Sequence, residues 1–240
     1  YNYKAFAVLY VDDEEMSLSS FTLAYEDEFR ILTASNAKEG LRLLEQHKDE
    51  IGLLMTDQRI LAAMRLAMMV AIPCSAVSGN QFVSVTTTMV RLTLDHGLAP
   101  ASAFGFVLYS NILCGPMKQH PLGYRFGKLA MDLVEKLDLP DMYPIVALSF
   151  ESSVRHWVDH QSNSLAPLLE GYRLGTSQGD FGTATLCAVN HCTQMLQSGR
   201  PLDQVLATMI EILAGLERIK QAGHLITIRI ERAAVDALVR

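Results

Sequence analysis

Residues 5–15 read AFAVLYVDDEE, an uninterrupted apolar run that ends in four acidic residues. A continuous run of strand-forming residues is typical of a parallel strand buried on both faces, and the sudden acids mark its carboxyl end. Residues 51–56, IGLLMT, repeat the pattern and are followed by Asp57. The sequence therefore predicts two buried strands, each ending in carboxylates.

The elements between these strands complete an alternating order. They are a helix over 16–25, a strand over 29–33 and a helix over 37–47. Asn36 is a suitable cap for the last helix, and Leu41 and Leu44 share one of its faces. Strand, helix, strand, helix, strand predicts an α/β fold with a three-stranded parallel sheet and right-handed crossovers.

The carboxyl ends of the strands also predict a site. In open parallel sheets the functional crevice lies outside these ends, and we expect the first and third strands to be neighbours there. Asp12, Asp13 and Asp57 would then meet, and three carboxylates in one shallow site repel unless a cation is present. Mg²⁺ prefers such oxygen ligands, and it can neutralise a phosphoryl group that arrives on a carboxylate.

Three stretches of this region resemble the receiver domain of two-component response regulators. They are VLYVDDEE (8–15), ILTASNAKEGLRLLEQ (31–46) and LLMTDQR (53–59). The resemblance implies that Asp57 is the phosphoacceptor, that Asp12 and Asp13 bind Mg²⁺, and that the backbone carbonyl of Arg59 completes the metal site. It also implies a phosphorelay partner, a sensor histidine kinase or kinase module.

The receiver resemblance stops after Ile60, where the sequence continues LAAM (61–64). A complete receiver has two further strands, a Ser or Thr near the phosphate and a pairing Lys. Thr86–88, in FVSVTTT, offer an alternative second half, but the next lysine, Lys118, lies in a turn-like GPMKQHP stretch. We interpret residues 1–60 as a partial receiver, whose exposed third strand is covered by the following helices or by self-association.

Residues 61–240 read as an all-α region. Helices are expected over 61–71, 81–96, 101–114, 123–137, 144–160, 164–176, 182–197, 202–221 and 226–239. Pro73 is expected to end the first of them, and LITIRI (225–230) alone would suggest a strand. Apolar helix pairs recur about every 40 residues, the range of helical solenoid units.

Small residues fall where paired helices would approach closely: Gly123, Gly127, Ala130, Gly171 and Gly175. This helical-repeat region resembles the tetratricopeptide-like region of large AAA-ATPase and kinase multi-sensor signalling proteins. The stretches that carry the likeness are MVRLTLDHG, SAFGFVLYSNILCG, YRFGKLAMDLVEK, VRHWVDH, PLLEGYRLGTSQGDF and SGRPLDQV. The resemblance implies a scaffold that binds protein partners, with no catalytic residue.

Composition supports the same division. Residues 1–60 hold 12 of the 26 acidic and 6 of the 20 basic residues, so they account for the net charge of -6, and all eight prolines follow them. Half the chain is hydrophobic, which excludes a disordered tail, and acidic clustering argues against nucleic-acid binding. The four cysteines lack the paired spacing of a disulfide framework, which predicts reduced thiols in a cytoplasmic protein. Polar residues interrupt each long apolar run, which predicts that the chain does not enter a membrane.

Two weaker metal patterns remain. His156 and His160 are one helical turn apart, and Cys187, His191 and Cys192 cluster in sequence, but neither spacing matches a known zinc motif. We favour ordinary packing for both.

Two functions remain open. In the first, a non-enzymatic signalling protein accepts phosphate at Asp57 with Mg²⁺, and its helices relay the state to protein partners. In the second, the partial receiver is a structural remnant or an artificial join, is not phosphorylated, and the helices alone act as a binding scaffold.

Overall fold

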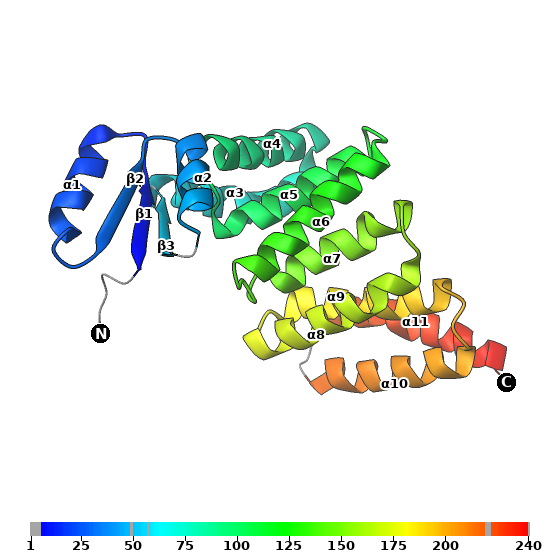
Figure 1. Cartoon of the computed structure of the whole chain (residues 1–240). Coiled ribbons are helices and arrows are strands. Elements are labelled where there is room, and N and C mark those ends of the chain that lie inside the picture. Colours follow the sequence, from blue (N-terminus) through cyan, green and yellow to red (C-terminus); the bar gives the residue numbers. More distant parts are fainter. Residues whose placement is uncertain (1–5, 49, 57, 219–221, 240) are drawn as a thin grey trace. The chain divides into compact units, whose positions relative to one another are not determined.

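The computed structural model describes residues 6–48, 50–56, 58–218 and 222–239 (Figure 1). The chain divides into two compact units, residues 1–105 and 106–240, and each is described by itself. The expected change of architecture lies inside the first unit: the last strand ends at residue 56, and the described residues after it form helices and the turns between them. The α/β and helical fold classes are thereby confirmed.

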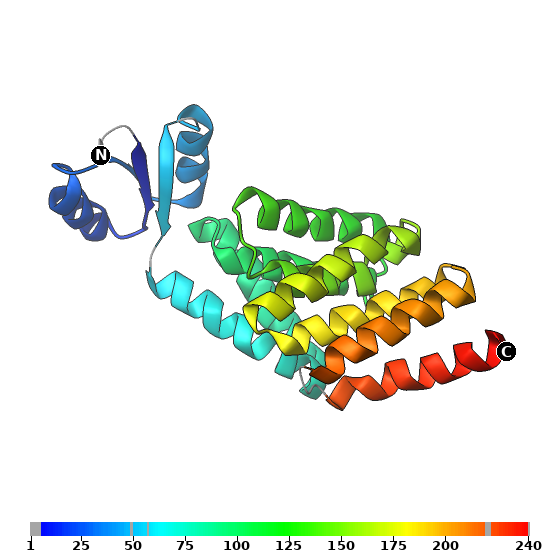
Figure 2. The same cartoon turned by 90° about the horizontal axis from the view of Figure 1, so that it is seen from below.

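The sheet consists of β1 (Ala7–Val11), β2 (Arg30–Ala34) and β3 (Ile51–Thr56), with α1 (Glu15–Tyr25) and α2 (Ala37–Gln46) as crossovers. All pairings are parallel and the strand order is β2-β1-β3, so the first and third strands are neighbours as expected. The first crossover runs from the central β1 to the edge strand β2, and the second returns in the opposite direction past β1 to β3. Figure 2 shows the resulting arrangement, with α1 and α2 on opposite sides of the sheet.

The face of the sheet that α2 covers forms a small core. Leu9, Val11 and Ala34 are buried there and pack against Leu43 and Leu44 of the helix. The predicted cap is confirmed, since the side chain of Asn36 accepts a hydrogen bond from the amide of Glu39 at 2.9 Å. The predicted helix face was partly wrong: Leu41 is 53% exposed, because Leu43 and Leu44 take the side that faces the sheet.

The opposite face is held more loosely. Helix α1 has no buried residue. One aromatic contact joins it to the sheet: Tyr10 of β1 lies 4.4 Å from Phe21, ring centroid to centroid. Within the helix, Phe21 lies 4.9 Å from Tyr25. Met16 and Leu23 remain 76% and 77% exposed, so this face has far fewer apolar contacts than the α2 side.

Helices α3 (Gln58–Val77) and α4 (Gly79–His96) pack against each other and complete the first unit together with the start of α5 (Pro100–Cys114). The expectation that Pro73 ends α3 was wrong, because the helix continues four residues beyond it. A proline removes one backbone donor and disturbs the preceding turn, but it does not prevent the next turn from forming. There the hydroxyl of Ser75 donates to the carbonyl of Ile72 at 2.7 Å.

Helix α3 is unusually apolar and exposed. Its segment Ile60–Val77 has a mean hydropathy of 2.0 over 18 residues, and 11% of the segment is buried. By length and composition it meets the requirement for a membrane-spanning helix, the one helix to do so among the described residues. Arg65 is the single charged residue of this segment. It interrupts the apolar run in the sequence, but the segment still forms one predominantly apolar helix.

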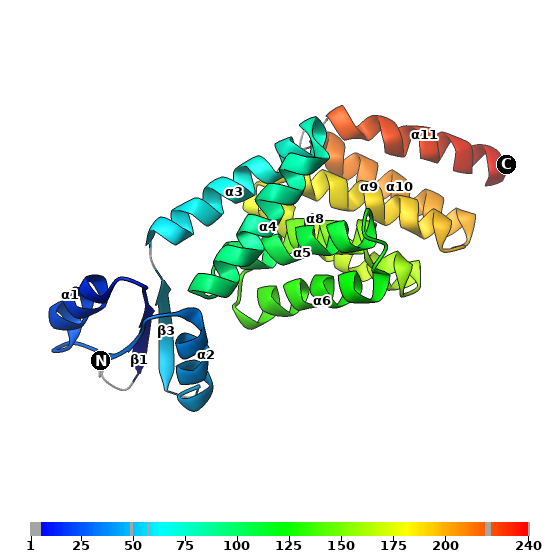
Figure 3. The same cartoon turned by 90° about the horizontal axis from the view of Figure 1, so that it is seen from above.

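The second unit is helical throughout its described part. After α5 come α6 (His120–Lys136), α7 (Tyr143–Ser153), α8 (Leu165–Gln178), α9 (Phe181–Gln197), α10 (Leu202–Arg218) and α11 (Ala222–Val239). Residues 225–230 lie within α11, so the strand alternative for LITIRI was wrong. Helices adjacent in sequence pack side by side from α6 to α11 (Figure 3). The tetratricopeptide-like type of repeat stays a prediction.

The helix expected over 144–160 ends early. Helix α7 stops at Ser153, and two short 3₁₀ turns, η2 (Arg155–Trp157) and η3 (Gln161–Ser164), lead to α8. An ion pair holds this corner: Arg155 donates to both carboxylate oxygens of the fully buried Glu151, with Nη2 at 2.8 Å from Oε1. The backbone carbonyl of Glu151 in turn accepts from the side chain of Gln194 at 3.0 Å. These polar contacts fasten the end of α7 to α9.

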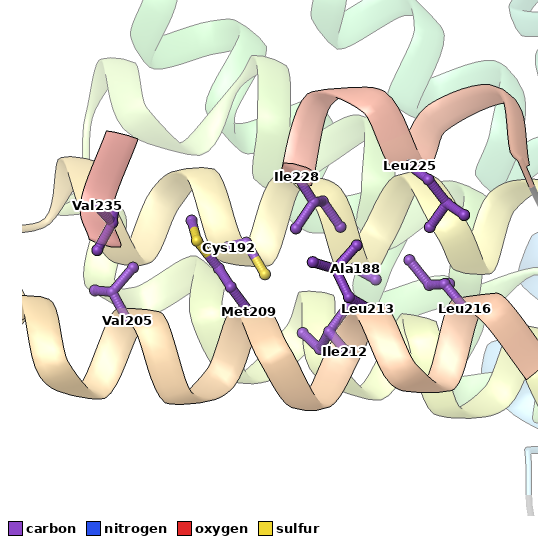
Figure 4. Packing of buried hydrophobic residues seen from close by; sticks show 10 residues of the cluster. All are labelled: Ala188, Cys192, Val205, Met209, Ile212, Leu213, Leu216, Leu225, Ile228 and Val235. Atoms are coloured by element: carbon purple, nitrogen blue, oxygen red, sulfur yellow. The ribbon is translucent and has the colours of Figure 1, made fainter. Parts of the chain in front are cut away.

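Glycines allow the close helix approach that the sequence predicts. A Cβ atom at Gly171 would lie 2.9 Å from Sγ of Cys187, and one at Gly127 would overlap the ring of Phe150. Further along the unit, α9, α10 and α11 share one apolar cluster (Figure 4). Its buried members are Ala188, Cys192, Val205, Met209, Ile212, Leu213, Leu216, Leu225, Ile228 and Val235.

Candidate functional site

The first candidate site lies where β1 ends. Asp12 directly follows the strand and is 4% exposed, while Asp13 is exposed. The loop fixes the buried carboxylate: Oδ2 accepts from the hydroxyl of Tyr10 at 2.6 Å, and Oδ1 accepts from the amide of Glu14 at 2.9 Å. Each carboxylate oxygen has a second lone pair, so Asp12 is held in place and can still accept a cation.

Asp12 and Asp13 line the same pocket of about 200 Å³, so the structure brings these two predicted residues together. Ser35 and Asn36 at the end of β2 form another part of its wall. The last residues of α4 close it. The full lining is Val11, Asp12, Asp13, Ser35, Asn36, Asp95 and His96.

Sequence reasoning missed Asp95 and His96. Their stretch, LTLDHG, carries a helix-end signal, and Gly97 indeed takes a φ of 97° after α4. Nothing in the sequence relates that helix end to β1, which lies 85 residues earlier in the chain. Only the packing of α4 within the first unit brings the two together.

The chemistry of this pocket favours a cation. Two aspartates, a third carboxylate from Asp95 and the negative end of the α4 dipole all lower the potential there. His96 is the one side chain among these lining residues that can carry positive charge. Carboxylate oxygens suit a hard divalent ion such as Mg²⁺, so Asp12 and Asp13 fit the predicted metal by donor type.

The structure does not place the other two predicted ligands, Asp57 and the carbonyl of Arg59, at this pocket. Asp57 lies outside the described residues, and within the described ranges no three acidic, His or Cys side chains are grouped closely enough to hold a metal ion. Arg59 lies in the first turn of α3, where a backbone carbonyl points along the helix toward the amide four residues on. The metal role of its carbonyl stays a prediction.

A second, more open cleft lies between α1 and the end of β2. It measures about 760 Å³, and its acids are Asp13, Glu15, Glu26 and Glu39. The backbone amide and the hydroxyl of Ser35 both donate a hydrogen bond to the Glu39 carboxylate at 3.0 Å. These hydrogen bonds, above all the one from the backbone amide, lower the pKa of that carboxyl. Both pockets are acidic, but Asp12 lines the smaller one and not this cleft, so the smaller pocket at β1 is the better placed site.

The alternative second half of a receiver was wrong. The segment with Thr86–88 forms helix α4, and Thr86 is buried on it instead of lying at the end of a strand. Within this helix the hydroxyl of Thr87 donates to the carbonyl of Val83 in the preceding turn at 2.8 Å, a bond that threonine can make in a helix. Helical spacing thus prevails over strand propensity here.

The weaker metal patterns are explained by packing. His160 caps η3 through Ser162, and His156 lies 5.0 Å from Trp157, ring centroid to centroid. Cys187 and Cys192 are both buried, and burial raises the pKa of each thiol to about 12. Thiols held in the neutral form are poor metal ligands.

The chain is similar to the hybrid signal transduction histidine kinase G of Dictyostelium discoideum. The two are 29% identical over 117 residues, which are 48% of this chain and 3% of the relative's length. The matched stretch is nearly twice as long as residues 1–60, so a large part of it lies in the helical region. No family model and no solved structure matches the chain. Part of this chain is therefore distantly related to a signal-transduction protein.

Proposed function

We propose that this chain is a segment of a signalling protein, in which residues 1–60 accept a phosphoryl group at Asp57 and the helices provide surfaces for protein partners. The observation that carries the proposal is the β2-β1-β3 parallel order, with the fixed Asp12 and exposed Asp13 at the carboxyl end of the central strand. The similarity to a signal-transduction kinase supports the same class of function.

Each residue has a role in this proposal. Mg²⁺ would be held by Asp12, Asp13 and Asp57 with the carbonyl of Arg59, and it would supply positive charge to the incoming phosphoryl group. Tyr10 and the amide of Glu14 keep the Asp12 carboxylate oriented toward the pocket. The phosphoryl donor would be a phosphohistidine of a sensor histidine kinase or kinase module. The chain itself is proposed to be cytoplasmic and not an enzyme.

The alternative, a helical scaffold with an inactive partial receiver, has its own support. The pocket at β1 has no lysine among its lining residues, and Asp95 adds a negative charge where a phosphorylated aspartate would require positive charge. In addition, Leu53 of β3 is 53% exposed, so the third strand has an open apolar position that suits contact with another chain. Self-association through β3 would fit this alternative.

Beryllofluoride, which mimics an aspartyl phosphate, separates the two functions. With Mg²⁺ and beryllofluoride added to the full chain, we expect amide NMR shifts at residues 11–14, which lie at the end of β1. Asp57→Asn should abolish these shifts, whereas Asp27→Asn, which removes an exposed acid after α1, should not. If the shifts persist in Asp57→Asn, or if the parent chain shows none, the phosphoacceptor function is refuted and the scaffold function is supported.

A further inference from the structure

The second unit contains a cavity that neither function uses. It measures about 440 Å³ and lies between α8, α9 and α10. Leu165, Leu169, Met195 and Ile212 give it an apolar wall. Cavities of a few hundred Å³ with an apolar wall and a few polar groups are typical of small-molecule sites.

Three arginines surround the cavity, from separate parts of the chain. Arg173 comes from α8, Arg200 from the turn before α10, and Arg218 from the end of α10. Glu211 is the one acidic residue of the lining, so the cavity has a local charge of about +2 in a chain whose net charge is -6. This local reversal of sign favours an anionic occupant.

The arginines keep donors available. Arg173 has a carboxylate neighbour at 3.8 Å, Glu170, but both side chains are largely exposed and such pairs contribute little. Arg218 uses Nε to bond the carbonyl of Ala214 at 3.1 Å, which leaves the two terminal nitrogens of its guanidinium. Guanidinium groups bind carboxylates and phosphates through paired hydrogen bonds.

A glycine makes room at the polar end. A Cβ atom at Gly215 would lie 2.5 Å from the hydroxyl of Tyr172 and 4.0 Å from Nη2 of Arg218. The missing side chain thus lets a phenol and a guanidinium converge over the backbone of α10. Both can donate hydrogen bonds to one ligand group.

A buried histidine lines the same cavity. His191 is 6% exposed, and its Nδ1 lies 2.8 Å from the carbonyl of Leu165. Because a carbonyl only accepts, Nδ1 carries the hydrogen, and Nε2 is the acceptor of the neutral ring. Burial lowers the pKa of His191, so this neutral form prevails at pH 7. The ring offers an acceptor to a hydroxyl or N–H of an occupant.

We propose that this cavity binds a small organic anion, whose acidic head is held by Arg218, Arg200 and the hydroxyl of Tyr172 and whose apolar body lies against Leu165 and Ile212. The site lies within one compact unit and involves neither Asp57 nor Mg²⁺. It would make the packing of α8, α9 and α10 dependent on a ligand, and so give the helical scaffold a chemical input separate from phosphorylation.

The direct probe is anilinonaphthalene sulfonate, which combines an aromatic body with an anionic head and fluoresces when bound. With the full chain we expect one saturable site. Arg218→Ala and Arg200→Ala should each weaken its affinity at least about tenfold, as expected for loss of a charge-assisted hydrogen bond. Both side chains are exposed, so urea midpoints of the variants should match the parent. Arg125→Ala, an exposed arginine of α6 outside the cavity, is the matched control.

NMR of the His191 ring gives the location, because its Nε2 resonance should shift as the probe binds. Competition then identifies the head group: benzoate and phenyl phosphate compare carboxylate with phosphate, and inorganic phosphate tests the need for an apolar body. Displacement by either aromatic acid supports the proposal. Equal probe affinity in both arginine variants, an unshifted His191, or displacement by acidic peptides alone would overturn it.

Discussion

Gly127→Ala should destabilise the second unit, although alanine favours helices over glycine. The added Cβ atom would lie 2.6 Å from Cε2 of Phe150, whereas carbon atoms pack at about 3.5–4.0 Å. The ring has little freedom to move, since Phe150 is 1% exposed and the Arg155 guanidinium lies 4.9 Å from its centroid. Either the ring or the two helices must therefore shift.

The size of the effect is the balance of two opposed contributions. Replacing glycine by alanine inside a helix stabilises it by about 1 kcal/mol. Overpacking a core costs about 1–3 kcal/mol, and the confined ring of Phe150 places this case near 3 kcal/mol. We expect a net loss of about 2 kcal/mol in the free energy of unfolding.

Urea unfolding followed by tryptophan fluorescence measures this loss. Trp157 is the single tryptophan and lies in the same unit, stacked on His120 with a centroid distance of 4.2 Å. With a slope of about 2 kcal/mol/M, the midpoint should fall by about 1 M. Gly182→Ala is the matched control, because its Cβ would meet nothing closer than 3.8 Å in the first turn of α9. Its midpoint should stay the same or rise.

A second variant tests the cause. Phe150→Leu removes the ring that the new Cβ would meet, so it should cost less stability in the Gly127→Ala background than in the parent chain. Equal costs in both backgrounds would refute the proposed collision. So would a Gly127→Ala midpoint at or above that of the parent.

Three further predictions concern polar contacts. Glu151→Gln should lower the free energy of unfolding by about 3 kcal/mol, which is the lower end of the range for breaking a buried ion pair. The loss stays at this lower end because Arg155 keeps Asp159 as a partner at 3.1 Å, and thermal unfolding measures it. Hydrogen bonds, above all one from the backbone amide of His160, hold the pKa of the Asp159 carboxyl below its usual value. The carboxylate therefore stabilises the fold above the ordinary carboxyl range, and this stabilisation is lost as the pH falls through the lowered pKa. Measured against pH, the free energy of unfolding should show this loss in the parent chain and not in Asp159→Asn. Asn36→Ala should cost about 1 kcal/mol and speed amide hydrogen exchange in α2, because the amide of Glu39 loses its cap.

Matched variants separate these effects from general damage. Lys38→Ala alters an exposed position of α2 without touching the cap and should leave hydrogen exchange unchanged. Asp141→Asn removes an exposed carboxyl of the second unit and should preserve the pH profile of the parent. A Glu151→Gln variant as stable as the parent would mean that the pair contributes no net stability.

The sequence predicts the elements of this chain better than their ends. Apolar runs that end in acids locate β1 and β3, because burial on both faces of a parallel strand leaves a strong pattern. The end of α3 was missed, since a proline weakens a helix locally but neighbouring turns and packing on α4 keep it going. The early end of α7 coincides with the Glu151–Arg155 pair and with the hydrogen bond from Gln194, which lies 43 residues away and is not visible in the local sequence.

The candidate sites show the same limit. Asp12 and Asp13 are found from sequence because they directly follow a strand. His96 and Asp95 join them only through helix packing, which no spacing encodes. The cavity in the second unit draws residues from 165 to 218, and its polar end depends on the absence of a side chain at Gly215. Convergence of this kind becomes visible only in three dimensions.

The packing of sequence neighbours from α6 to α11 has a consequence for how the chain folds. Contacts such as those between α8 and α9 close only short loops, so the second unit should fold quickly once its helices form. Pairing of β1 with β3 must instead bring Ala7 to Ile51 across two crossovers, which costs more loop-closure entropy. During synthesis the sheet region, which folds more slowly, is made before the helical unit. The sheet therefore has time to assemble before the faster-folding helices are synthesised. Stopped-flow refolding of the full chain should accordingly show the helical unit, reported by Trp157, forming ahead of the sheet.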